Sequence, residues 1–176
     1  MRRARLLISA SLPALTALLP VAAFAGFNFP SIDGGTIDLD AFEGRPVLVV
    51  NTASLCGFAD QFDDLQALHD SYADRGLVVL AVPSDDFRQE LGSADEVKEF
   101  CAVNFDLTIP MTDITPVTGE GAHPFYLWLA ETEGFIPRWN FNKVLLDGDG
   151  DVVATWGSVM RPTARPVTDR IEALLP

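Results

Sequence analysis

The stretch from residue 46 to residue 83 is PVLVVNTASLCGFADQFDDLQALHDSYADRGLVVLAVP, and it decides the fold. Val47–Val50 is a continuous apolar run typical of a buried strand, and Leu77–Val82 is a second such run. Between them, apolar side chains recur every three or four residues over Phe58–Tyr72, which predicts an amphipathic helix closed by Gly76. A strand, a helix and a strand in this order predict a βαβ unit of an α/β domain.

The segments on either side of this unit complete the expected fold. Short apolar runs around Asp33-Gly34-Gly35 predict an N-terminal β-hairpin within residues 26–45. After the unit we expect, in order, a helix beginning at the capping box Ser93-Ala94-Asp95-Glu96, a short strand Leu107–Met111, a helix Pro124–Ala130, a hairpin of strands Phe141–Leu146 and Val152–Trp156, and a closing helix Thr168–Leu175. This order favours an α/β, thioredoxin-like fold with a central mixed sheet, an N-terminal β-hairpin and flanking helices.

Residues 1–25 have the pattern of a secretory signal peptide. Three Arg residues form a basic start, residues 6–20 are mostly apolar and uncharged, and Ala23-Phe24-Ala25 is a small-x-small cleavage site. We therefore expect a signal peptide (1–25), a single domain (26–176), export to the periplasm or secretion, and no membrane attachment after cleavage. An uncleaved anchor stays open as the alternative, and Arg2-Arg3 leaves both Sec and twin-arginine export open.

Charge and composition exclude several classes of protein. The chain has 12 Lys and Arg against 25 Asp and Glu, a formal charge of −13, which argues against nucleic-acid binding. Its 2 Cys and 2 His are too few for a disulfide scaffold or a four-sulfur metal site. The run Asp147–Asp151 begins like a calcium loop, but Val152 and Ser158 stand where Gly and Glu are needed, so we expect a hairpin turn. We expect neither a cofactor nor a metal.

Cys56 is the residue best placed to carry chemistry. It follows a buried strand and comes about two residues before a helix, whose N-terminus favours the thiolate. A thiolate exposed in a loop would be open to oxidants, whereas a small buried hydrophobic residue is the alternative interpretation. Ala59 excludes a Cys-x-x-Cys motif. Cys101 is the sole other cysteine, and a bridge to it requires Cα atoms within about 7 Å.

Several segments resemble the glutathione peroxidase family. They are Val49–Phe58, Gly76–Pro83, Phe100-Cys101, Ile109–Met111, His123–Tyr126 and Trp139–Lys143. The resemblance covers nearly all of residues 27–175 and implies a thioredoxin fold that reduces hydrogen peroxide and organic hydroperoxides with a thiol donor, glutathione or a thioredoxin-like protein. It also implies that Cys56 is the peroxidatic residue, which peroxide oxidises to a sulfenic acid. The Trp139 indole and the Asn140 amide would then donate hydrogen bonds to the thiolate and to the leaving oxygen.

The chain departs from the family pattern after the second strand. Asp86 stands where the family has a catalytic Gln. An ionised carboxylate only accepts hydrogen bonds and would raise the pKa of a nearby thiol, so we expect slower peroxide reduction unless Asp86 is protonated or points away. The segment after Phe87 is one residue shorter than usual, and Gln89 matches the second Gln of that loop as a reserve donor. Asn51 matches a scaffold position beside the site.

Two further features concern the thiol donor and the assembly. Cys101 falls one residue before the resolving Cys of thioredoxin-dependent members, which turns its side chain by about 100° on a helix. Resolution by Cys101 and resolution by an external thiol therefore both stay open. No basic cluster for glutathione is evident, with Arg88 and Lys143 as unspecific candidates. The short span between Met111 and Trp139 lacks the insertion of tetrameric members, which predicts a monomer.

Two other functions stay open at this point. A thiol–disulfide exchange protein on the same fold would form an accessible Cys56–Cys101 bridge. A non-catalytic redox sensor or binding protein would leave Cys56 near the free thiol pKa of about 8.5. The match at Trp139-Asn140 favours the peroxidase, because thiol exchange alone does not need those donors.

Overall fold

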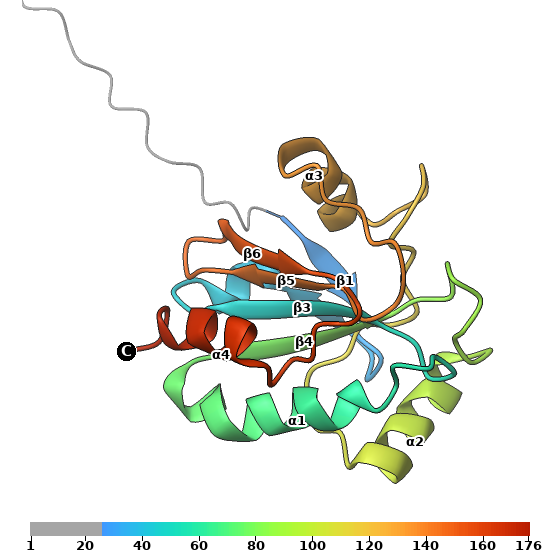
Figure 1. The fold of residues 1–176 in the computed structure, drawn as a ribbon. Coiled ribbons are helices and arrows are strands. Elements are labelled where there is room, and N and C mark those ends of the chain that lie inside the picture. Colours follow the sequence, from blue (N-terminus) through green and yellow to red (C-terminus); the bar gives the residue numbers. More distant parts are fainter. Residues whose placement is uncertain (1–25) are drawn as a thin grey trace, which may run out of the picture.

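A computed structural model describes residues 26–176, and a four-stranded mixed sheet forms its centre (Figure 1). The strand order is β4-β3-β5-β6. β3 (Val47–Thr52) pairs in parallel with β4 (Val78–Pro83) and antiparallel with β5 (Lys143–Leu146). β6 (Val152–Trp156) extends the sheet antiparallel to β5. The βαβ unit and the mixed sheet that the sequence predicts are both confirmed.

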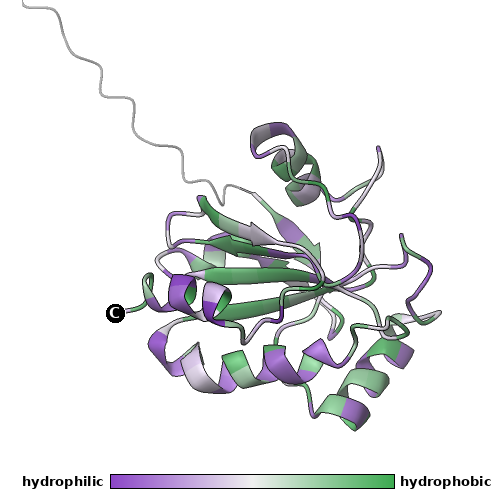
Figure 2. Cartoon of the chain, in the orientation of Figure 1, coloured by the Kyte–Doolittle hydropathy of each residue, from purple (hydrophilic) through white to green (hydrophobic). Residues whose placement is uncertain are grey.

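Helices cover both faces of the sheet. They are α1 (Gln61–Tyr72), α2 (Ala94–Phe105), α3 (Pro124–Thr132) and α4 (Arg165–Glu172). Leu48 and Val50 face a core shared with α1, α2 and α4, whereas Val47 and Val49 face a core shared with α3. The central strands are therefore apolar on both sides, and Figure 2 shows them as a hydrophobic centre with polar residues on the outer helices.

Both predicted hairpins are present. β1 (Asn28–Pro30) pairs antiparallel with β2 (Thr36–Asp38), and the 3-10 helix η1 (Leu39–Phe42) follows. Between β5 and β6, the Asp147 carboxylate accepts hydrogen bonds from two amides of the same turn, each at 3.0 Å. Asp147 is thus occupied as a turn residue, as its position in the sequence predicts.

Local capping signals set the starts of two helices. The Glu96 amide donates to the Ser93 hydroxyl oxygen at 3.3 Å, which is the capping box expected for α2. The Phe125 amide donates to His123 Nδ1 at 3.2 Å, so His123 caps α3. Both starts follow from side chains beside the helix, which explains why the sequence locates them well.

The strand expected over Leu107–Met111 is wrong. Met111 makes only an isolated parallel bridge to Ala81, and the next residue, Thr112, makes an isolated bridge to Ser31. Pro110 has no amide hydrogen, so it can accept a hydrogen bond from the Ala81 amide but cannot donate one in return. A continuous ladder cannot form there.

Other elements differ from expectation at their ends. β5 begins at Lys143 rather than at residue 141, because Phe141 has φ +61°, a left-handed conformation that a strand cannot contain. α1 begins three residues later than predicted, and the 3-10 helix η2 (Ala73–Arg75) follows it before Gly76 reverses the chain with φ +111°. α4 begins earlier than expected, with Pro166 in its first turn.

The predicted signal peptide lies outside the described residues. Within residues 26–176, no helix has both the length and the apolar character needed to cross a membrane.

Candidate active site

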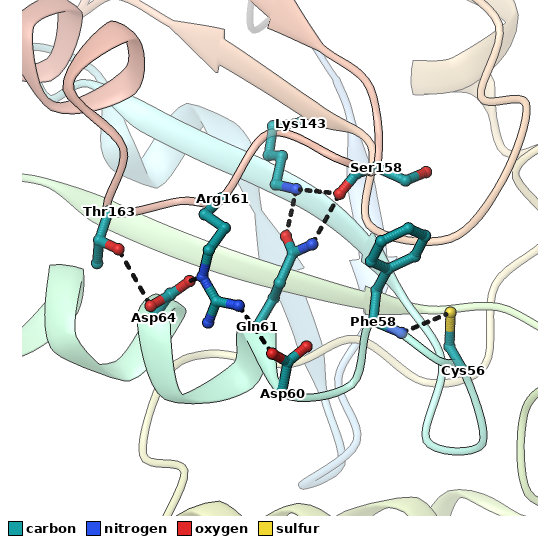
Figure 3. A network of polar contacts seen from close by, with 9 residues as sticks. All are labelled: Cys56, Phe58, Asp60, Gln61, Asp64, Lys143, Ser158, Arg161 and Thr163. Carbon is teal, nitrogen blue, oxygen red and sulfur yellow. Dashed lines mark hydrogen bonds and ion pairs between the residues drawn. The ribbon is translucent and has the colours of Figure 1, made fainter.

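Cys56 lies in the loop between the carboxyl end of β3 and the start of α1. The Phe58 amide donates to Cys56 Sγ at 3.5 Å (Figure 3), and the Ala59 amide donates to the Cys56 carbonyl oxygen at 3.0 Å. The Cys56 sulfur thus accepts a hydrogen bond from the backbone of its own loop. The prediction that Cys56 comes about two residues before a helix is wrong, because α1 begins at Gln61, five residues after Cys56.

The Cys56 side chain is nearly buried although its neighbours are exposed. Cys56 has 6% relative exposure, whereas Leu55 is 60% exposed and Gly57 is also exposed. The expectation of an exposed loop is therefore right for the backbone but wrong for the cysteine, whose thiol turns inward to the Phe58 amide. An oxidant must reach the sulfur through the small exposed part of this residue.

Asn51, at the end of β3, holds the Trp139-Asn140 segment beside the sheet. Its Nδ2 donates to the Trp139 carbonyl oxygen at 3.0 Å, and its Oδ1 accepts from the Asn142 amide at 3.0 Å. Its own carbonyl oxygen accepts from the Phe141 amide at 2.5 Å. Asn51 is buried and uses both ends of its amide, which fits the scaffold role expected of it.

Trp139 is at the surface beside the loop that follows β4. It is 41% exposed, and its ring centroid lies 5.5 Å from that of Phe87. Packing against Phe87 limits how the indole can turn while leaving it accessible from solvent. An indole in this position can donate its N–H to a group that enters from outside.

Asn140 and Gln89 form a direct hydrogen bond that links two loops. Asn140 Nδ2 donates to Gln89 Oε1 at 3.2 Å, and the Leu55 amide donates to the Gln89 carbonyl oxygen at 2.9 Å. Gln89 therefore contacts both the segment that carries Trp139 and the residue that precedes Cys56. Asn140 is fully buried, and its Oδ1 has no partner among residues 26–176.

Asp86 points toward a different segment of the chain. Its Oδ2 accepts hydrogen bonds from the Val117 amide at 2.7 Å, the Thr118 amide at 2.8 Å and the Thr118 hydroxyl at 3.0 Å. In all three contacts the Asp86 side chain is the acceptor. The structure thus favours the second of the two alternatives, that Asp86 points away, and it brings Gln89 rather than Asp86 to Asn140.

Cys101 is buried on α2, and both cysteines are free. Burial raises the pKa of the Cys101 thiol to about 12, and the nearby Glu90 carboxylate adds to this shift. Glu90 is itself buried, with Oε1 accepting from the Ser54 and Leu91 amides at 2.9 Å each. Burial raises the pKa of Glu90 as well. Cys101 thus sits where formation of a thiolate is unfavourable.

The sequence interpretation missed the structural importance of Glu90, Gln61 and Lys143. Lys143, a candidate for a basic cluster, is fully buried and cannot bind an external carboxylate. No local pattern distinguishes these residues from ordinary surface polar residues, because their partners are far away in the chain. Among residues 26–176, no group of three or more His, Cys, Asp and Glu side chains could hold a metal ion.

The family model described as glutathione peroxidase matches residues 24–130. The chain belongs to the glutathione peroxidase family. Members of this family reduce hydroperoxides with thiols, so the predicted enzyme class is confirmed: the chain is a thiol-dependent peroxidase, with a hydroperoxide substrate and a thiol reductant.

Similar proteins support both the family and the fold. The hydroperoxy fatty acid reductase gpx1 of Synechocystis sp. is 40% identical over 148 residues, which cover 78% of this chain and 88% of that protein. The crystal structure of Trgpx in its apo form has a TM-score of 0.69 at 30% identity and covers 88% of this chain and 96% of that one. A thiol:disulfide interchange protein DsbE from Chlorobium tepidum has a TM-score of 0.62 at 18% identity, covering 84% of this chain and 92% of that one. It shares the thioredoxin-like fold and shows nothing further for this peroxidase.

Proposed function

We propose that Cys56 is the peroxidatic residue of this peroxidase. The observation that carries the proposal is the hydrogen bond from the Phe58 amide to Cys56 Sγ, in the segment that resembles the family's active site. The thiolate attacks one oxygen of the hydroperoxide, an S–O bond forms and the O–O bond breaks. The leaving alkoxide or hydroxide takes a proton and departs as alcohol or water, and Cys56 becomes a sulfenic acid.

Trp139, Asn140 and Gln89 are the proposed donors around the reacting oxygens. The indole N–H of Trp139 can donate to the leaving oxygen, where negative charge develops. Gln89 uses its Oε1 for Asn140 and keeps its Nε2 to donate. Asp86 is left outside this set, because its carboxylate is already bound to the Val117-Thr118 segment.

An external thiol is the proposed reductant of the sulfenic acid. Its thiolate attacks the Cys56 sulfur and expels water, and a second thiol then attacks the mixed disulfide, which restores the Cys56 thiol and releases a disulfide. The two thiols supply two electrons for each peroxide. Burial of Cys101 and its raised pKa disfavour it as the attacking thiol. Of the basic candidates only Arg88 is exposed, and it could meet a carboxylate of glutathione.

Organic hydroperoxides, including those of fatty acids, are proposed substrates beside hydrogen peroxide. The name of the Synechocystis relative supports this class. In this chain, Leu55 directly precedes Cys56 and Trp139 directly precedes Asn140. Both are exposed and offer apolar surface to a hydrocarbon chain.

We also propose that residues 26–176 are exported after removal of a signal peptide and that the protein is a monomer. Mass determination of the secreted protein and its size in solution would test them.

The test is single-turnover oxidation of the reduced protein. Stopped-flow mixing with hydrogen peroxide and with a fatty-acid hydroperoxide should oxidise one thiol per chain, and mass spectrometry after dimedone trapping should place the sulfenate on Cys56. Cys56→Ser should abolish the reaction, and Cys101→Ser is the matched control that should retain it. A reaction that survives Cys56→Ser would refute the assignment.

A thiol–disulfide exchange function is the second candidate, and it has less support. The fold is shared with thiol:disulfide interchange proteins, but at identities that speak for the fold alone. Both cysteines are buried and free, so the two thiols do not form the accessible pair that exchange requires. Insulin reduction by the protein without peroxide would revive this candidate.

A further inference from the structure

Lys143 is a fully buried cation in the middle of the sheet. It lies at the start of β5, pairs with Val50 on one side and Trp156 on the other, and has 0% exposure. A buried ammonium group is costly unless each of its hydrogens has an acceptor. The hydrogen bonds that Lys143 makes therefore indicate its role in the structure.

The ammonium group meets three carbonyl oxygens from three segments. Lys143 Nζ donates to Gln61 Oε1 at 2.5 Å and to the Ser158 carbonyl oxygen at 3.4 Å (Figure 3). It also donates to the Phe141 carbonyl oxygen at 2.7 Å. An ammonium group has three hydrogens and no acceptor, so this set of oxygens matches its charged form.

Gln61 connects this group to the Cys56 loop. It is the first residue of α1, and its backbone amide donates to the Phe58 carbonyl oxygen at 2.9 Å. The amide of the same Phe58 donates to Cys56 Sγ. Gln61 Nε2 also donates to the Ser158 carbonyl oxygen at 2.7 Å, so its side chain is held at both ends.

Phe141 connects the same ammonium group to the other half of the site. It directly follows Trp139-Asn140, and its φ of +61° is a strained conformation for a residue with a side chain. Its amide donates to Asn51 and its carbonyl oxygen accepts from Lys143, so both polar groups of this residue are fixed.

We propose that Lys143 is a positioning residue of the peroxidase, whose ammonium group holds the Cys56 loop and the Trp139-Asn140 segment in register with each other. This role rests on the proposed function of those two segments. It acts through Gln61 and Phe141, without contact to the peroxide.

The charge on Lys143 makes this role depend on pH. Burial lowers the pKa of Lys143 to about 7, while Asp64 of α1 raises it and Arg161 lowers it. Asp60 and Asp64 are in turn bound to Arg161 at 2.7 and 2.6 Å, so one guanidinium group offsets part of the charge of two carboxylates. Above neutral pH the neutral amine has only two hydrogens for three acceptor oxygens, so one of the three hydrogen bonds of Lys143 is lost.

The experiment compares pH profiles of Cys56 reactivity in four proteins. They are the wild type, Lys143→Met, Gln61→Glu and the control Lys98→Met, which removes an exposed lysine paired with Asp33. Reaction rates are measured between pH 5 and pH 9 with hydrogen peroxide, and separately with iodoacetamide, whose product on Cys56 is quantified by mass spectrometry. Urea unfolding of each variant checks that it is folded at the assay pH.

In the wild type, the reaction rate of Cys56 should rise with pH as the thiolate forms. The same profile should show a second inflection near neutral pH, where Lys143 loses its proton. Lys143→Met should lack it and react with peroxide about tenfold or more slowly at pH 6, since small misplacements of a reacting group have effects of this size. Gln61→Glu should move the inflection upward by about one pH unit or more, because a carboxylate favours the ammonium form. Lys98→Met should match the wild type.

Identical profiles in all four proteins with both reagents would overturn the role of Lys143. If Lys143→Met does not fold, an unmoved inflection in Gln61→Glu would overturn it equally well. If peroxide fails to react in every protein while the iodoacetamide profiles differ as described, the positioning role stands and the proposed peroxidatic role of Cys56 falls.

Discussion

Replacement of Gln89 by Leu should slow the oxidation of Cys56, whereas replacement of Asp86 by Asn should not. Gln89 Oε1 accepts the 3.2 Å hydrogen bond from Asn140, whose side chain is fully buried and whose Oδ1 has no partner within residues 26–176. Gln89→Leu would leave both polar atoms of that amide without a protein partner. A buried polar group that loses its partner costs about 1–3 kcal/mol.

That cost sets the size of the expected effect. If it falls on the transition state, in which Asn140 must be held beside the leaving oxygen, the rate constant drops about 5- to 150-fold, since roughly 1.4 kcal/mol is a factor of ten. Asp86→Asn is the matched control, because the Asp86 carboxylate binds Val117 and Thr118 instead. It should lower the free energy of unfolding by about 1–2 kcal/mol. Its rate constant should stay within about threefold of the wild type, as for a change outside the transition state.

The assay is anaerobic stopped-flow oxidation of the reduced protein by excess hydrogen peroxide. Tryptophan fluorescence and dimedone trapping report the same step by two independent signals, and urea unfolding of each variant gives its stability. The reasoning is refuted if Gln89→Leu reacts at the wild-type rate, or if Asp86→Asn is the slower of the two. The second result would mean that the residue at position 86 acts at the sulfur despite its contacts with Thr118.

Three further changes test other parts of the site and fold. Trp139→Phe keeps the packing on Phe87 but loses the indole N–H, and stopped-flow oxidation should be slower by about a hundredfold, as after loss of an oxyanion donor; an unchanged rate would exclude a donor role. Cys101→Ser should leave the rate of peroxide turnover with an external thiol within about twofold of the wild-type rate, because a buried thiol with a pKa of about 12 is a poor attacking group. A Cys56 sulfenate that lasts longer in this variant than in the wild type would show that Cys101 resolves it. Burial holds the pKa of His123 below its usual 6.5, so the stability that it contributes is present above pH 6.5 and is lost as the pH falls. Urea unfolding should therefore show a smaller loss between pH 7.5 and pH 5 in His123→Asn, which keeps a capping acceptor for Phe125, and equal losses would contradict this.

The elements that the sequence predicts well are those whose determinants are local. The apolar runs of β3 and β4, the capping box at Ser93 and the His123 cap each depend on residues within a few positions. The strand expected over Leu107–Met111 fails for the opposite reason. Its pairing depends on a partner strand, and Pro110 removes the donor that a ladder needs there.

The site shows the same division between local and distant determinants. The position of Cys56 between a strand and a helix follows from its neighbours in the sequence. The direction of Asp86 depends on free amides at Val117 and Thr118, some 30 residues away in the chain. The burial of Lys143 depends on acceptors from α1 and from Ser158. Such contacts form only when the chain is folded, so no pattern within a short window of the sequence could reveal them.

A turn in the loop that follows β4 brings Gln89 to Asn140. Arg88 adopts φ +57°, a left-handed turn that is unusual outside glycine, and Gln89 follows it. The Gln89 carbonyl oxygen then binds the Leu55 amide while its side chain meets Asn140. The turn at Arg88 is therefore followed by a side chain, Gln89, that meets Asn140, whereas Asp86 binds Val117 and Thr118. A pattern that requires Gln at position 86 would classify this chain as defective, whereas the contact of Gln89 with Asn140 and the binding of the Asp86 carboxylate to Val117 and Thr118 support the donor role proposed for Gln89.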